Sequence, residues 1–112
     1  MARRQRDYRA EYIARNKRSQ ERYGVTYNQQ RRAIARSSAP ASVVRDIIAR
    51  AHTEGRNPIA VVGEADRLGK FISDNAGSQD KARRRQVGEA YSDLDDLVGE
   101  DNVEDFINYS GE

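Results

Sequence analysis

The 112-residue sequence contains no cysteine and no tryptophan, and it has only two proline residues. The absence of cysteine excludes a disulfide framework and any metal site built on thiolates. No apolar run approaches the roughly 18 residues that a membrane-spanning helix requires, so we expect no membrane segment. The basic N-terminus is not followed by a hydrophobic segment, and we therefore expect no secretory signal.

Large apolar side chains are also scarce. Leucine, isoleucine, valine and phenylalanine together account for only 20 of the 112 residues. That share lies just under the level of about 20% below which chains tend toward disorder. A chain of this size and composition buries a small core only. We therefore expect it to depend on a partner for part of its stability, either as a homo-oligomer or within a larger assembly.

Glycine residues divide the sequence into helical segments, because glycine is common just past a helix C-terminus. The four dividing residues are Gly24, Gly55, Gly77 and Gly99. The predicted helices cover about residues 5–23, 27–37, 41–54, 58–75 and 79–98, followed by a short last helix. We therefore predict an all-α fold, a small multi-helix domain with a basic N-terminal helical arm (residues 1–38) and a helical core domain with an acidic C-terminal helix (residues 39–112).

Several of these helices carry a capping signal at the N-terminus. Thr26 is a predicted cap, as are Ser78 and the Asn57-Pro58 pair. Asp101 followed by Glu104 resembles a capping box and predicts the start of the last helix.

The clearest core pattern lies in the helix predicted for residues 41–54. Val44, Ile47, Ile48 and Ala51 are spaced at i, i+3, i+4 and i+7, which is typical of the buried stripe of a helix. The opening of the following segment, Ile59–Val62, is rich in β-branched residues, and a short strand is the alternative to a helix there.

Catalytic and metal-binding motifs are missing from the sequence. Residues 63–71 imitate a phosphate-binding loop, but five residues separate the two glycines where four are needed, and Phe71 replaces the hydroxyl residue that binds Mg²⁺. The alternative is an amphipathic helix whose glycines allow close packing. His52 is the only histidine, so a zinc site is not expected. We predict that the protein is not an enzyme and needs no cofactor.

Charge is distributed very unevenly along the chain. Residues 1–50 hold 13 Lys and Arg against 4 Asp and Glu, whereas residues 87–112 hold 9 Asp and Glu without any Lys or Arg. In the segment 79–98 the cations come first and the acids last, an order that opposes the helix dipole at both ends. This order indicates that something else, such as a partner, compensates the charges.

The basic arm interleaves arginine with tyrosine, a combination suited to phosphates and unpaired bases. The residues predicted to contact nucleic acid are Arg3, Arg4, Arg6, Tyr8, Arg9, Tyr12, Arg15, Lys17, Arg18, Arg22, Arg31 and Arg32. Two alternatives stay open at this point. The arginines also suit an acidic protein surface, including the C-terminal segment of a neighbouring copy, or they form an ordinary solvated surface.

Residues 6–15 read RDYRAEYIAR, and residues 22–32 read RYGVTYNQQRR. This pattern resembles the N-terminal segment of small proteins of bacteriophages that infect actinobacteria. The resemblance covers about the first third of the chain and implies a phage protein in the host cytoplasm or the virion. Two functions follow as hypotheses: nucleic-acid binding through the basic N-terminal helices, or a structural virion component (minor capsid, connector or accessory protein) that docks subunits through its basic arm and acidic tail.

Overall fold

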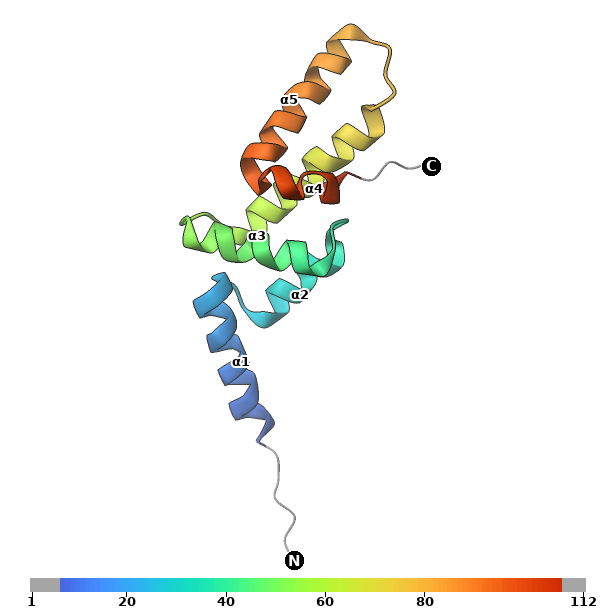
Figure 1. Ribbon diagram of the computed structural model, residues 1–112. Helices are drawn as coiled ribbons and strands as arrows, with labels where there is room; N and C mark the ends of the chain where they lie inside the picture. The colour runs from blue at the N-terminus through green and yellow to red at the C-terminus, as the bar shows by residue number, and fades with distance from the viewer. Residues whose placement is uncertain (1–6, 108–112) are drawn as a thin grey trace, which may run out of the picture.

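The computed structural model describes residues 7–107, which form five α-helices and two short 3-10 turns (Figure 1). The elements are α1 (Tyr8–Tyr23), α2 (Tyr27–Arg36), α3 (Ala41–Thr53), α4 (Pro58–Asn75), α5 (Lys81–Val98), η1 (Glu100–Asn102) and η2 (Glu104–Phe106). No strand occurs among the described residues, so the predicted all-α fold is confirmed. The segment Ile59–Val62 belongs to the first turns of α4.

Two of the predicted caps are confirmed. The Thr26 hydroxyl accepts from the Gln29 N–H at 3.2 Å, and the Gln29 side chain accepts from the Thr26 N–H at 2.9 Å, which completes a capping box at the start of α2. The Asn57 side chain accepts from the N–H groups of Ile59 and Ala60 at 3.1 and 3.2 Å. Both helices therefore begin where the sequence places them.

Two other predicted starts are displaced. Asp7 caps α1, which therefore begins at Tyr8 rather than at residue 5. Asp80, not Ser78, caps α5 by accepting from the Ala82 N–H at 3.0 Å. The Ser78 hydroxyl instead accepts from the Asp80 N–H at 3.2 Å, the local side-chain turn that serine forms before a helix.

The predicted last helix is present as the two 3-10 turns η1 and η2 rather than as one α-helix, and neither turn has the predicted side-chain cap. Val103 and Phe106 are both buried. Side chains at i and i+3 eclipse one another in a 3-10 turn, so the tighter turn directs both residues into the core.

Helix α3 lies at the centre of the fold and packs against α1 and α2 on one side and against α4 on the other (Figure 1). Its predicted stripe of Val44, Ile47, Ile48 and Ala51 is buried as expected. The antiparallel α4–α5 hairpin then extends away from this centre. As a result, α1 and the α4–α5 turn lie at opposite ends of the described chain (Figure 1).

Gly69 lets the C-terminal turns lie directly on α4. A Cβ atom at this position would overlap the main-chain carbonyl group of Phe106, with the carbonyl carbon only 2.7 Å away. The segment 63–71 runs through the middle of α4. Close packing therefore accounts for Gly69, whereas a Cβ at Gly63 would meet open space.

The order of charges in α5 is unfavourable for the helix dipole, and Arg50 compensates for it at the C-terminal end of the helix. Its guanidinium donates to the Val98 carbonyl at the C-terminus of α5, at 3.0 Å. A cation at this end of a helix interacts favourably with the helix dipole. The compensating group at the C-terminus of α5 is thus a side chain of α3 in the same chain.

We predict opposite effects for alanine at the two glycines of α4. Gly69→Ala should destabilise the protein by about 1–3 kcal/mol, since α4 and η2 must separate to admit the methyl group. Gly63→Ala should stabilise it by about 0.5–1 kcal/mol through reduced backbone entropy of the unfolded chain. Urea unfolding followed by circular dichroism measures both changes, and equal effects of the two variants would contradict the packing assigned to Gly69.

Candidate nucleic-acid interface

Helix α1 is anchored by its C-terminal half only. Ser19 is buried, whereas Tyr8, Tyr12 and Ile13 in the first half are 69, 52 and 56% exposed. By helical spacing Tyr8 and Tyr12 lie on the same face as Ser19. The packing face of α1 therefore continues beyond the core, where it presents two aromatic rings.

A polar cluster fixes α1 against α2. The Ser19 hydroxyl donates to the Val25 carbonyl at 2.7 Å and lies 3.4 Å from Oε1 of the buried Gln30. The Asn16 side chain accepts from the Tyr27 N–H at 3.2 Å. These contacts fix the direction in which α2 leaves the turn.

The turn itself requires glycine at position 24. Gly24 has a φ of 70° and caps α1 in the left-handed conformation, which glycine adopts without steric cost. A Cβ there would also lie only 2.9 Å from Cγ of His52 in α3. The glycine thus allows α1, α2 and α3 to meet closely.

Two arginines, one from α1 and one from α2, lie over the ring of Tyr27. The guanidinium carbon of Arg15 in α1 lies 4.9 Å from the ring centroid, and that of Arg31 in α2 lies 5.9 Å from it. Cations over an aromatic face are held by its quadrupole. Arg18 and Arg22 share the face of α1 that carries Arg15.

We call Arg15, Arg18, Arg22 and Arg31 the α1–α2 basic surface. Arg22 also lies over the ring of Tyr23, at 5.4 Å from its centroid. The other predicted cations are exposed but lie elsewhere: Arg9 and Lys17 on other sides of α1, and Arg32 on the far flank of α2. The structure therefore brings together only part of the predicted set, and Arg3, Arg4 and Arg6 lie outside the described residues.

The cations of α1 and α2 are not neutralised within the described part of the chain. The ion pairs found in residues 7–107 join Arg50 and Arg56 to Glu54, and Arg67 to Glu64. None of them involves a cation of α1 or α2.

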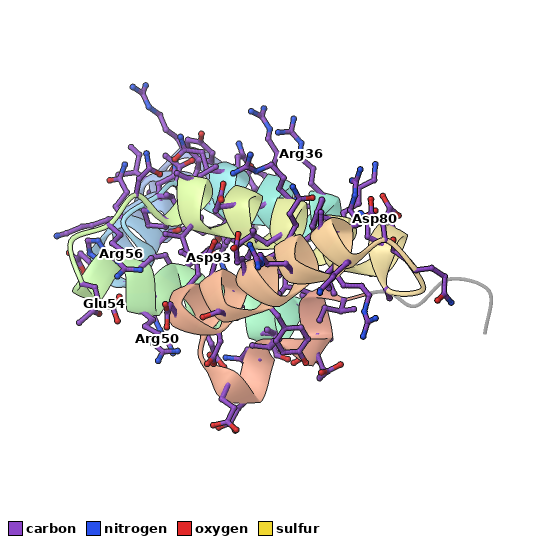
Figure 2. All side chains as sticks on the ribbon, turned by 90° about the horizontal axis from the view of Figure 1, so that it is seen from above. Arg36, Arg50, Glu54, Arg56, Asp80 and Asp93 are labelled. Carbon is purple, nitrogen blue, oxygen red and sulfur yellow. The ribbon has the colours of Figure 1, made fainter. Side chains whose placement is uncertain are left out.

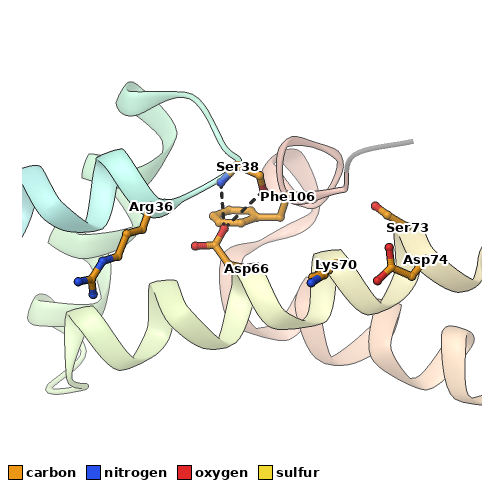
Figure 3. A pocket seen from close by; sticks show the side chains of 7 residues that line it. All are labelled: Arg36, Ser38, Asp66, Lys70, Ser73, Asp74 and Phe106. Atoms are coloured by element: carbon orange, nitrogen blue, oxygen red, sulfur yellow. Dashed lines mark hydrogen bonds between the residues drawn. The ribbon is translucent and has the colours of Figure 1, made fainter. Parts of the chain in front are cut away.

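A groove of about 370 Å³ runs between α2, α4 and η2, and it carries both signs of charge (Figure 3). Arg36 and Lys70 line it together with Asp66 and Asp74. Asp66 accepts from the Ser37 hydroxyl at 2.8 Å and holds the linker between α2 and α3 across the predicted boundary at residue 38. With two acids beside two cations, the groove is a poor site for a polyanion.

The predicted set of nucleic-acid contacts left out two residues of α2. Tyr27 was not among the predicted contacts, although its spacing of four residues from Arg31 is the available signal. Arg36 was also outside that set, and in Figure 2 it projects from the side of the molecule opposite Arg50. The cations that the sequence places at the start of α5 were not predicted to contact nucleic acid, and they are exposed.

No group of three or more His, Asp and Glu side chains in residues 7–107 is arranged to hold a metal ion. Over the same range, none of the helices combines the length and the apolar character needed to cross a bilayer. Comparison with protein-family models, with curated proteins and with solved structures finds no match for this chain.

We predict that Ser19 is essential to the α1–α2 joint. Ser19→Ala should cost about 1–3 kcal/mol of stability, because it removes the buried donor to the Val25 carbonyl. Ser42→Ala is the matched control at an exposed position of α3, where a change below about 0.5 kcal/mol is expected. Chemical unfolding compares the two, and an equal loss in both variants would show that the Ser19 hydroxyl does not hold the joint.

Proposed function

We propose that this protein binds nucleic acid without catalysis, through the α1–α2 basic surface. The observation that carries the proposal is the set of cations on α1 and α2 without an ion pair in the described chain. Residues 7–36 hold eight Lys and Arg against three Asp and Glu. Such an excess attracts phosphate and gains free energy from the release of its counterions.

The geometry of the basic surface supports a phosphate backbone as the ligand. Arg15 and Arg31 are ordered by one ring and come from two helices, so less side-chain freedom is lost when they meet phosphate. A planar guanidinium also matches phosphate with two parallel hydrogen bonds.

Tyr8 and Tyr12 extend the surface toward unpaired bases. Both side chains are exposed, and stacking of a base on an aromatic ring is favourable for every base and therefore tolerant of sequence. The proposed binding is accordingly dominated by backbone contacts, and single-stranded regions gain from the two rings.

We predict that Arg15→Gln, Arg18→Gln and Arg22→Gln together weaken binding to a random duplex by roughly one to two orders of magnitude at low salt. The plot of log affinity against log salt should also become shallower, by up to about 2.7, as three phosphate contacts disappear. Fluorescence anisotropy across a salt series measures both quantities.

The control removes the same charge from other exposed positions, through Arg45→Gln, Arg56→Gln and Arg67→Gln. This control triple should retain nearly all of the affinity and the salt slope. Equal losses of affinity in the two triple variants would show that only the net charge matters, and would refute a defined binding surface on α1 and α2.

A structural virion component is the second candidate, and the acidic residues of the C-terminal part favour it. They form a band that carries no ion pair in the described chain: Glu89, Asp93, Asp95, Asp96, Glu100, Asp101, Glu104 and Asp105. In this function the acidic band docks onto the basic helices of a neighbouring copy.

We predict for this second candidate that the wild-type protein self-associates at low salt, and that Asp93→Asn, Asp95→Asn and Asp96→Asn together weaken the association. Sedimentation velocity at two salt concentrations measures it. A wild-type protein that stays monomeric at low salt would remove the support for docking between copies.

A further inference from the structure

We propose that the tip of the α4–α5 hairpin is a second nucleic-acid contact, so that one copy of the protein bridges two nucleic-acid segments. This inference rests on the proposed function of the α1–α2 basic surface. The tip cluster consists of Lys81, Arg83, Arg84 and Arg85 in the first turns of α5.

Every residue of the tip cluster is exposed, and no ion pair among residues 7–107 involves it. Lys81, Arg84 and Arg85 share one face of α5 by their i, i+3 and i+4 spacing. They border an open hollow together with Asp80. The opposite face of the helix carries the buried Ala90 and Leu94, which pack toward α4.

The position of the tip cluster is unfavourable for the fold. Cations near a helix N-terminus oppose the helix dipole, and like charges at i, i+3 and i+4 repel one another. The only acid in the first turns is the cap, Asp80. Because the core does not use these four side chains, a polyanion outside the chain is the group that makes them favourable.

The acidic band separates the two basic regions. The C-terminal end of α5 and the turns η1 and η2 lie beside α3, between α1 and the hairpin tip (Figure 1). This band repels phosphate, which disfavours a single nucleic-acid segment that runs past the C-terminal end of α5 from α1 to the tip. The proposal therefore assigns the two contacts to two segments.

A bridging assay tests the inference with the full chain. One duplex of about 20 base pairs, roughly two helical turns, is held on beads, and a second, fluorescent duplex is free in solution. The wild-type protein should bring fluorescence to the beads. Capture should rise and then fall as protein is added, because excess protein occupies each duplex separately.

The decisive variant combines Lys81→Gln, Arg84→Gln and Arg85→Gln. It should lose at least nine-tenths of the bridging while its affinity for one duplex in anisotropy falls no more than about threefold. Its stability in urea should equal or exceed that of the wild type, since charges that oppose the helix dipole are gone. The control triple at Arg45, Arg56 and Arg67 should bridge normally.

The outcomes separate this inference from the proposed function. If the tip variant bridges as well as the wild type, the tip is not a second contact, and bridging by a dimer replaces it. If the tip variant loses all binding while the Arg15, Arg18 and Arg22 variant retains it, the proposed function of the α1–α2 basic surface fails as well. If the tip variant loses self-association in sedimentation instead of bridging, its ligand is the acidic band of another copy and the inference is overturned.

Discussion

The apolar stripe of α3 is the contact on which the rest of the molecule depends. The stripe consists of Val44, Ile47, Ile48 and Ala51, and it is buried among α1, α2 and α4. The same core continues along the hairpin through buried side chains of α4, α5 and η2, such as Ile72, Leu94 and Phe106. Because large apolar residues are few, it reaches neither the first half of α1 nor the hairpin tip. The first half of α1 and the tip of the hairpin consequently project from the core on opposite sides.

The charged side chains are also divided between the core and the projecting ends. A few charged groups take part in the fold: Arg50 caps α5, Asp66 holds the linker between α2 and α3, and Asp80 starts α5. Other charged groups include exposed cations on α1, on α2 and at the hairpin tip, and acids at the C-terminal end of α5 and in the turns that follow it. The small core therefore leaves two basic regions available to phosphate and places a repulsive band between them.

Much of the fold could be predicted from local signals. Thr26 and Asn57 mark helix starts because a cap depends only on the next few residues, and the stripe of α3 follows from spacing alone. The start of α5 and the turns η1 and η2 could not be predicted in this way. The start of α5 depends on whether Ser78 or Asp80 caps the helix. The turns η1 and η2 depend on the close contact between the main chain of Phe106 and Gly69 of α4.

The candidate site was predictable in composition but not in shape. The excess of arginine and tyrosine in the first third of the chain is visible in the sequence. Which arginines converge depends on the angle between α1 and α2, and that angle depends on Ser19 and Gly24 through contacts between distant residues. Spacing within one helix gives no information about a ring such as Tyr27 that two helices share.

The most direct test of this account is a nuclear magnetic resonance titration of the ¹⁵N-labelled protein with a short duplex, following backbone amides and arginine Nε–H groups. The account predicts shifts in residues 8–36 and 81–86 and unchanged signals in residues 89–105, because phosphate meets the two basic regions and avoids the acidic band. Shifts centred on residues 89–105, or an unchanged spectrum at low salt, would contradict it.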